Sequence, residues 1–312
     1  MLHRHAHHSR GRGRTDGGRS LSRVDIEAVR EARAERPERI ARAFAERRRR
    51  PLTRGDGRLF IVAADHPARG ALGVGGNPLA MADRDGLLER LAIALSRPGV
   101  DGVLGTPDII DDLALLGLLD DKIVVGSMNR GGLRGASFEM DDRFTAYDVP
   151  TMTASGIDFA KTLMRIDLAD AATADTLEAT ARAVTQAAAA KLPIMLEPFL
   201  SRRVDGTVVN DLSTEAVIHS VAIASGLGAS SAYTWMKLPV VEEMERVMAA
   251  TTLPTLLLGG DNGASPDETY RSWENALALP GVRGLTVGRT LLYPHDDDVE
   301  TAIDIAARLV HP

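Results

Sequence analysis

The feature that most constrains the fold is an alternation of short apolar segments with helical segments, which fills the chain after residue 58. Near-continuous apolar strands that are each followed by a helix are typical of a parallel sheet covered on both faces. Eight such units fit a single (β/α)₈ TIM barrel, and the lack of G-x-G-x-x-G after the first strand weakens the doubly wound alternative. We therefore predict an α/β barrel with strands at residues 59–65, 102–107, 122–127, 157–167, 192–198, 232–239, 253–260 and 283–289.

A basic N-terminal segment precedes the predicted barrel. Residues 1–54 contain 16 Arg against 7 Asp and Glu, and residues 24–50 have helical periodicity with a break at Pro37. We expect a basic tail and helix at 1–54 and the barrel at 55–312. A basic segment can contact nucleic acid, but this one has a single aromatic side chain, Phe44, for base stacking. We therefore expect a solvated tail with a surface helix, and no nucleic-acid partner.

The composition argues against several other classes of protein. The chain of 312 residues is 44% hydrophobic, enough for a sizeable core, but it has no apolar run of transmembrane length and no signal-peptide core near its start. It has no cysteine, which excludes disulfides and thiolate chemistry. We expect a cytoplasmic protein with no membrane partner and no functional metal site. Only adventitious metal binding is expected of the early histidines His3, His5, His7 and His8.

Lysine is rare in this chain and marks positions of interest. Of 37 basic residues only four are lysines, namely Lys122, Lys161, Lys191 and Lys237. Arginine stays protonated at neutral pH, whereas a buried lysine can lose its proton. Lys237 stands out because it interrupts the apolar run AYTWMKLPVV, which predicts a buried strand. Burial of an ammonium group is costly, so this lysine is expected either to be paired or to have a lowered pKa.

The ends of the predicted strands supply the candidate catalytic residues, because the active site of such a barrel lies at the carboxyl ends of its strands. Asp65 and Glu197 stand at such ends and Lys237 stands near one, and the fourth predicted strand carries Lys161. Low polarity and the charge of Lys161 would lower the pKa of Lys237, and a neutral amine attacks a carbonyl to form a Schiff base. The alternative is that Lys237 forms a structural ion pair with Glu197 or Asp65.

The polar residues around the lysines have open roles at this stage. Glu197 could act as a general base or as a lysine partner, or could cap the next loop. Asp65 could orient substrate hydroxyls or hold Lys161, or could make a local turn contact. His66 could act in acid–base chemistry, but Pro67 after it fits a loop-positioning role equally well.

Glycines at the ends of the seventh and eighth strands predict a phosphate site. LLLGGD provides Gly259 and Gly260, and LTVGRT provides Gly288 and Arg289. Glycines let backbone N–H groups approach an anion, arginine adds a bidentate partner, and barrels often bind phosphate after these two strands. The alternative is that the glycines serve only as turns.

Several motifs, taken in chain order, resemble those of the class I aldolases of the DhnA and tagatose-bisphosphate aldolase type, which are Schiff-base (β/α)₈ enzymes. The resemblance runs from about residue 58 to residue 310 and leaves the N-terminal segment outside it. The motifs that carry it are VAADHPARG, GIDFAKTLMRID, PIMLEPFL, YTWMKLPV, LPTLLLGGD and GLTVGRTLLYPHD.

The resemblance implies roles for the residues named above. Lys237 would form the Schiff base, Lys161 would be a second active-site lysine, and Asp65 and Glu197 would be their polar partners. The four phosphate-site residues would hold the phosphate of a small phosphorylated sugar. No metal or other cofactor is implied. Enzymes of this type are often homo-oligomers, and the oligomeric state of this chain stays open.

The chain also resembles an actinobacterial branch associated with inositol catabolism. This resemblance implies cleavage of 5-dehydro-2-deoxygluconate 6-phosphate to dihydroxyacetone phosphate and malonate semialdehyde. The substrate carboxylate would then need a cation. The candidates are Arg130, Arg134, Arg165, Arg202 and Arg203.

Three other functions stay open. A ketose bisphosphate of the tagatose or fructose type would need a second cation cluster, and none is obvious at the strand ends. A non-catalytic barrel could bind a phosphosugar with Lys237 as a binding cation. An isomerase could work by proton transfer through Glu197, without an imine.

Overall fold

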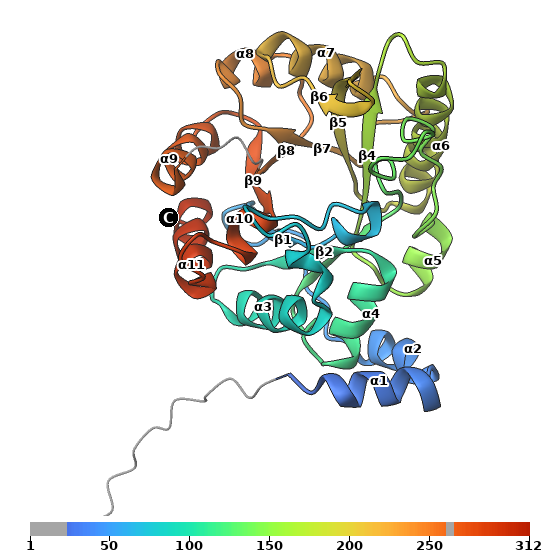
Figure 1. The fold of residues 1–312 in the computed structure, drawn as a ribbon, viewed down its shortest axis with the longest axis vertical. Helices are drawn as coiled ribbons and strands as arrows, with labels where there is room; N and C mark the ends of the chain where they lie inside the picture. The colour runs from blue at the N-terminus through green and yellow to red at the C-terminus, as the bar shows by residue number, and fades with distance from the viewer. Residues whose placement is uncertain (1–23, 260–264) are drawn as a thin grey trace, which may run out of the picture.

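Eight parallel strands form a closed barrel in the computed structural model, which describes residues 24–259 and 265–312 (Figure 1). The strands are β1 (Leu59–Ala63), β2 (Gly102–Gly105), β3 (Ile123–Ser127), β4 (Phe159–Ile166), β5 (Ile194–Val204), β7 (Thr234–Pro239), β8 (Thr255–Leu258) and β9 (Val282–Val287). Their hydrogen-bonded order is β4-β3-β2-β1-β9-β8-β7-β5, and β5 pairs with β4 to close the ring. The predicted single (β/α)₈ barrel is confirmed.

Helices surround the barrel (Figure 1). Two of them, α1 (Ile26–Glu35) and α2 (Glu38–Glu46), precede the first strand and are separated at Pro37, as the sequence predicts. Among the described residues, no helix combines the length and the apolar character needed to cross a membrane. The other helices are α3 (Arg84–Ser96), α4 (Pro107–Leu115), α5 (Val149–Ala154), α6 (Ala172–Ala190), α7 (Thr214–Ser225), α8 (Met244–Ala249), α9 (Pro266–Leu277), α10 (Arg289–Leu292) and α11 (Val299–Val310), with short 3₁₀ helices η1 (Pro67–Arg69) and η2 (Ala80–Ala82).

A β-hairpin at the end of β5 lies outside the predicted pattern. The strand continues beyond Pro198, where the prediction ends, and pairs in antiparallel fashion with β6 (Thr207–Asn210). Asp205 and Gly206 form the two-residue connection, with φ angles of 49° and 78°. An Asp-Gly pair favours this kind of turn. It is the sequence signal that could have revealed the hairpin.

Side chains alternate between the inside of the barrel and its helical coat. Leu59, Ile61 and Ala63 of β1 belong to an interior cluster, whereas Phe60 and Val62 pack with the larger cluster that includes the helices. This alternation follows from the two-residue period of a strand. The interior cluster is completed by Leu104, Ile123, Val125, Phe159, Met195 and Leu256.

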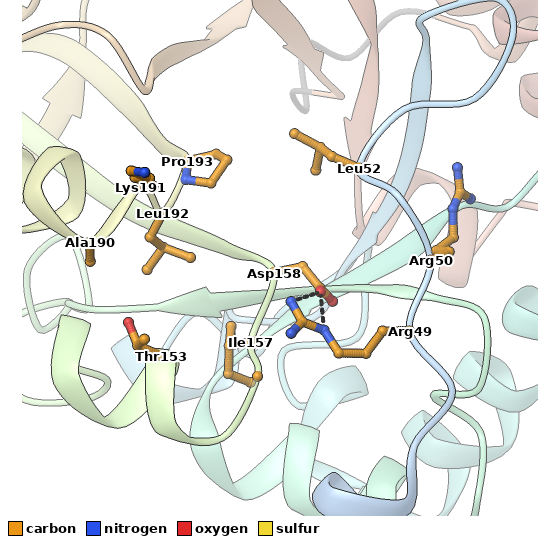
Figure 2. Close-up of a pocket in the computed structure, with 11 residues that line it drawn as sticks. Arg49, Arg50, Leu52, Thr153, Ile157, Asp158, Ala190, Lys191, Leu192 and Pro193 are labelled. Carbon is orange, nitrogen blue, oxygen red and sulfur yellow. Dashed lines mark hydrogen bonds and ion pairs between the residues drawn. The ribbon is translucent and has the colours of Figure 1, made fainter.

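Arginines attach the segment after α2 to the amino end of the barrel. Arg47 is buried and donates to the carbonyl oxygens of Lys122 and Gly156, at 2.9 and 2.6 Å, and to Asp158 at 3.1 Å. Arg49 donates twice to the same carboxylate and lines a pocket of about 360 Å³ (Figure 2). These contacts tie the N-terminal extension to the residues that lead into β3 and β4.

Candidate active site

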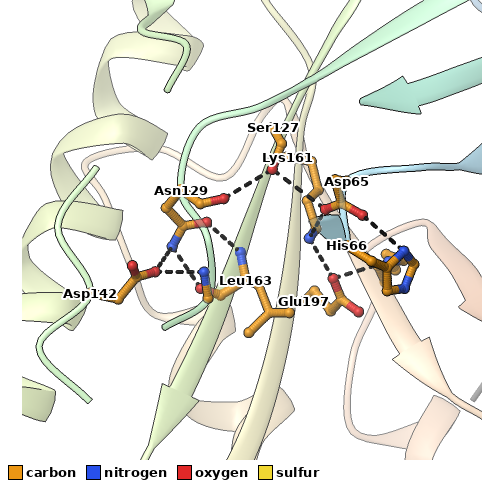
Figure 3. A network of polar contacts seen from close by, with 10 residues as sticks. Asp65, His66, Ser127, Asn129, Asp142, Lys161, Leu163 and Glu197 are labelled. Carbon is orange, nitrogen blue, oxygen red and sulfur yellow. Dashed lines mark hydrogen bonds and ion pairs between the residues drawn. The ribbon is translucent and has the colours of Figure 1, made fainter. Parts of the chain in front are cut away.

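Lys161 lies between two carboxylates at the carboxyl end of the barrel. Its side chain comes from β4 and is 2% exposed. Its Nζ lies 2.7 Å from Oδ2 of Asp65, two residues beyond β1, and 2.8 Å from Oε2 of Glu197 on β5 (Figure 3). Burial lowers the pKa of Lys161, but the two anions outweigh this effect and raise the pKa above its usual value. Lys161 therefore stays protonated.

Lys237 shares one of these carboxylates. Its Nζ lies 3.0 Å from Oε2 of Glu197, the same oxygen that Lys161 approaches. Burial lowers the pKa of Lys237, the attraction of Glu197 opposes this, and the ammonium of Lys161 lowers it further, so the balance is a lowered pKa. Lys161 contacts two carboxylates, whereas Lys237 contacts only Glu197, which it shares with Lys161. Lys237 is therefore the amine that loses its proton first.

The lysines in turn keep both carboxylates ionised. Burial would raise the pKa of each carboxyl group. Lys161 and Lys237 nevertheless lower the pKa of Glu197 to about 2, and Lys161 holds the pKa of Asp65 well below its ordinary value. At neutral pH the site therefore contains two carboxylates and at least one ammonium group. The structure pairs Asp65 with Lys161, which is one of the three roles considered for Asp65.

Aromatic side chains lie beneath the lysines in the barrel interior. Phe159 and Trp235 precede Lys161 and Lys237 by two residues, so they share their strand faces. The two rings contact each other edge to face, with centroids 5.5 Å apart. These rings close the barrel interior below the lysines, and burial is the main cause of the lowered pKa of Lys237. A further apolar cluster consists of Leu163, Phe199 and Leu258.

His66 lies beside Asp65 but does not form a close hydrogen bond with it. Its Nδ1 is 3.8 Å from Oδ1 of Asp65, beyond hydrogen-bond distance. Burial lowers the pKa of His66 to about 3, against the attraction of Asp65 and with the help of nearby cations. The imidazole is therefore neutral at pH 7. In the described part of the chain, no group of three or more His, Asp or Glu is placed to hold a metal ion, so His66 belongs to no such set.

Asn129 belongs to the long link between β3 and α5, residues 128–148, and attaches this link to β4. Its side chain donates to the carbonyl oxygen of Leu163 at 2.7 Å, accepts from the N–H of Leu163 at 2.9 Å and donates to Asp142 at 2.8 Å (Figure 3). Ser127, at the end of β3, points toward Asp65 with its Oγ 3.5 Å from Oδ2. Sequence analysis missed these residues because pairing across a long link has no fixed spacing. The unusual length of the link was the available signal.

Packing explains two glycines of the predicted phosphate site, Gly259 and Gly288. A Cβ at Gly288 would lie 2.3 Å from the carbonyl oxygen of Ala63, and a Cβ at Gly259 would lie 2.7 Å from Cγ1 of Val287. Neither position accommodates a side chain, whatever it binds. The other two predicted residues of this site are Gly260 and Arg289. Gly260 lies outside the described residues.

Arg289 begins the short helix α10 directly after β9. Its Nη1 donates to the carbonyl oxygen of Gly73 at 3.3 Å, in the segment that follows β1. Its charge is also among the cations that lower the pKa of His66. Arg289 therefore lies at the carboxyl end of the barrel, on the side of β9 and β1.

The five arginines considered for a substrate carboxylate differ in exposure. Arg165 has a side chain that is 13% exposed and lies on the same face of β4 as Lys161. It forms an ion pair with the buried Glu139. The others are exposed, namely Arg130, Arg134, Arg202 and Arg203. Exposure thus singles out Arg165.

This chain is similar to known proteins, among them two of solved structure. Cgl0159 from Corynebacterium glutamicum, in its crystal structure, is 73% identical, with a TM-score of 0.90 over 92% of this chain and 96% of that one. An archaeal fructose-1,6-bisphosphate aldolase, with its catalytic lysine covalently bound to the carbinolamine intermediate, is 20% identical, with a TM-score of 0.60 over 88% of this chain and 100% of that one. This second likeness is one of fold.

Another similar protein matches over a short stretch. It is 2-amino-3,7-dideoxy-D-threo-hept-6-ulosonate synthase 1 of Archaeoglobus fulgidus, 35% identical over 81 residues. The match covers 26% of this chain and 29% of that enzyme, so it spans less than a third of the enzyme's length.

The family comparison covers most of the barrel. Residues 57–307 match the model of the Cgl0159-like family. This range contains all the candidate site residues described above, from Asp65 to Arg289. The chain belongs to the Cgl0159-like family.

Proposed function

We propose that the protein is a class I aldolase in which Lys237 forms a Schiff base with a ketone substrate. The observation that carries the proposal is the pair of buried lysines on one oxygen of Glu197, which accompanies a lowered pKa of Lys237 and a raised pKa of Lys161. A neutral amine and a charged ammonium then lie side by side, one as nucleophile and one as proton donor. The archaeal aldolase of the same fold, which carries its intermediate on a catalytic lysine, supports this chemistry.

The first proposed steps form the Schiff base. The neutral Nζ of Lys237 attacks the ketone carbon, and one proton moves from nitrogen to oxygen to give a carbinolamine. Lys161 then donates a proton to the hydroxyl group, which leaves as water. The product is an iminium ion with one positive charge, and Lys161 is left neutral.

The iminium ion then accepts the electron pair of the carbon–carbon bond that breaks. The hydroxyl group on the departing carbon loses its proton, and this carbon becomes the aldehyde while the iminium becomes a neutral enamine. The positive charge of the iminium, which lay beside Glu197, is thereby lost, so the proton affinity of Glu197 rises as the hydroxyl proton leaves. We therefore assign the general base to Glu197 or to a group that it orients. Protonation and hydrolysis of the enamine release the second product and restore Lys237.

Asp65 is assigned a positioning role in these steps. It holds the ammonium group of Lys161 at 2.7 Å and so directs it toward Glu197 and Lys237. The proposed steps need no metal and no other cofactor, because the iminium ion accepts the electrons of the breaking bond. They also need no nucleic-acid or membrane partner.

For the substrate we propose 5-dehydro-2-deoxygluconate 6-phosphate, cleaved to dihydroxyacetone phosphate and malonate semialdehyde. The sequence resemblance described above supports this choice. The phosphate would be bound after β8 and β9 by Gly259, Gly260, Gly288 and Arg289. A ketose bisphosphate is the second candidate, favoured by the similar fold of the fructose-1,6-bisphosphate aldolase. We also propose that the protein is cytoplasmic, with residues 1–54 as an extension and residues 55–312 as the barrel.

Borohydride trapping tests the proposed function. The protein is incubated with dihydroxyacetone phosphate, reduced and digested, and the peptides are weighed by mass spectrometry. An adduct on the peptide that contains Lys237 is the expected result, because reduction converts an imine to a stable amine. Lys191→Arg, at an exposed lysine, is the matched control and should leave the adduct in place. Absence of any adduct on Lys237 would favour the non-catalytic barrel or the isomerase.

A further inference from the structure

A second group of cations lies at the carboxyl end of the barrel, on the side of β4. Arg165 follows Lys161 by four residues on the same strand face, so its Cα lies about 13 Å further along the strand. Its guanidinium group pairs with Glu139, whose side chain is 2% exposed. Its Nε is buried and has no hydrogen-bond partner among the described residues. Arg165 therefore retains donor capacity that its pairing with Glu139 does not use.

The long link after β3 fixes this ion pair. Glu139 accepts a hydrogen bond from the N–H of Gly135 at 3.0 Å. A Cβ at Gly132 would lie 2.4 Å from the backbone oxygen of Glu139 and 3.4 Å from Nη1 of Arg165. The link therefore packs directly on the pair and determines where the guanidinium group of Arg165 lies.

Arg69 adds a charge that no carboxylate of the described residues pairs with. It lies in η1, and its carbonyl oxygen accepts the N–H of Arg134 at 3.0 Å. Its side chain is half-buried and forms no ion pair within residues 24–259 and 265–312. In addition to the effect of burial, its charge lowers the pKa of both Arg165 and His66. Arg69 is thus close enough to the ends of both β1 and β4 to act on each.

The other acidic group near Arg165 does not remove this excess of positive charge. Asp142 accepts hydrogen bonds from the side chain of Asn129 and the N–H of Gly131, at 2.8 and 2.7 Å. Its charge also interacts with those of Lys161 and Arg130. With Glu139 engaged by Arg165, Arg69 has no anionic partner among residues 24–259 and 265–312.

Arg165 comes from the strand that lies across the barrel from the proposed phosphate site, whereas Arg69 follows β1, which is next to β9. β4 and β9 are four strands apart in either direction around the ring, so they are on opposite sides. Arg165 lies near the end of β4, and Arg289 lies directly after β9. The second cation cluster was not apparent from the sequence because Arg69 and Arg165 come from distant parts of the chain.

We propose that Arg165 and Arg69 bind the anionic group on the part of the substrate that becomes the leaving aldehyde. The proposal rests on the proposed aldolase function and adds the basis of its substrate selection. A phosphate held near Arg289 and a second anion held near Arg165 would stretch the carbon chain past the amine of Lys237. Carboxylates and phosphate esters share the oxygen geometry that guanidinium groups bind. The protein therefore selects an anionic aldehyde over a neutral one.

The first test measures aldol addition with dihydroxyacetone phosphate and three acceptors, namely malonate semialdehyde, glyceraldehyde 3-phosphate and neutral glyceraldehyde. In Arg165→Gln and Arg69→Gln we expect kcat/KM for the preferred anionic acceptor to fall about 10- to 100-fold more than that for glyceraldehyde, through loss of charge-assisted hydrogen bonds. The acceptor with the larger selective loss distinguishes a carboxylate from a phosphate. Equal losses for anionic and neutral acceptors would overturn the proposal.

Control variants keep this test decisive. Arg134→Gln removes an exposed arginine from the same link and should cause no selective loss. Arg165→Gln leaves Glu139 buried without its cation, which can destabilise the protein. Arg69→Gln breaks no ion pair among the described residues, and Glu139→Gln combined with Arg165→Gln removes both charges together.

A binding measurement separates this proposal from the aldolase proposal. Calorimetric titration with malonate needs no Schiff base. We expect the affinity for malonate to fall about tenfold or more in Arg69→Gln and Arg165→Gln and to stay unchanged in Arg134→Gln. This result would support the anion site even if borohydride failed to trap Lys237. Equal affinity in all variants would overturn it even if Lys237 were trapped.

Discussion

Lys161 and Lys237 approach the same oxygen of Glu197, at 2.8 and 3.0 Å from their Nζ atoms. One carboxylate oxygen offsets two buried ammonium groups only in part, so one of the two protons is held weakly. Lys161 has Asp65 as an additional partner, at 2.7 Å. The asymmetry between the two lysines therefore comes from Asp65, and it determines which amine can act as the nucleophile.

Replacement of Lys237 should abolish turnover. Lys237→Ala removes the amine, and Lys237→Arg keeps the charge but has a guanidinium group that stays protonated. Both should lower kcat by about 10⁴-fold or more, the scale seen when a covalent nucleophile is lost. The measurement is the rate of dihydroxyacetone phosphate release in each variant. Substantial turnover by Lys237→Arg would contradict the Schiff-base mechanism.

The pH dependence should respond to Glu197. In the wild-type protein kcat/KM should rise as Lys237 loses its proton, with an inflection below the ordinary lysine value of 10.5. Glu197→Gln removes the attraction that raises the pKa of Lys237, so the inflection should move to lower pH. The pH dependence of borohydride trapping reports the same ionisation without turnover. An inflection at unchanged or higher pH would show that Glu197 does not control this amine.

Glu197 should also make the folded protein sensitive to acid. Its pKa is about 2 in the folded protein against 4.5 for an unperturbed glutamate. Because this pKa is lowered on folding, the stabilisation is present above pH 4.5 and is lost as the pH falls toward 2, by about 3 kcal/mol in the free energy of unfolding. Urea unfolding at several pH values measures it. The free energy of unfolding should depend less steeply on pH in Glu197→Gln than in the wild-type protein. An identical dependence on pH would refute the lowered pKa of Glu197.

Strand periodicity and barrel geometry account for the part of the site that could be predicted. Asp65, Glu197 and Lys237 stand at or near the ends of different predicted strands, Lys161 lies on a fourth, and closing the ring brings these strands together. The structure favours a lysine-pairing role for both Asp65 and Glu197. The structural ion pair considered for Lys237 also exists, and it is the same contact that the proposed mechanism uses.

The contacts made by loops could not be predicted in this way. Asn129 with Asp142 and Arg165 with Glu139 join the long link to β4, and their spacing in the sequence follows no structural period. The folding of the link against the barrel decides which residues meet. Arg47 likewise reaches its partners only because the extension runs across the amino end of the barrel.

Replacement of Arg289 should weaken the binding of phosphate-bearing substrates. Arg289→Ala removes a guanidinium group at the end of β9, where the phosphate is proposed to lie. The KM for dihydroxyacetone phosphate should rise about tenfold or more, with a smaller change for unphosphorylated dihydroxyacetone. Arg283→Ala, at an exposed arginine on β9, is the matched control and should change neither value. An unchanged KM for the phosphate ester in Arg289→Ala would remove this residue from the phosphate site.

Loss of Arg47 should destabilise the protein although it lies at the end opposite the candidate active site. Arg47→Ala deprives the carbonyl oxygens of Lys122 and Gly156 of their donor and removes one of two arginines from Asp158. The buried Nε of Arg47 has no partner among the described residues, and its removal offsets part of this cost. We expect the free energy of unfolding to fall by about 2–4 kcal/mol, measured by urea titration. In Arg48→Ala, whose side chain is 69% exposed, it should change by less than about 0.5 kcal/mol. Equal stability of the two variants would mean that the extension contributes nothing to the stability of the barrel through Arg47.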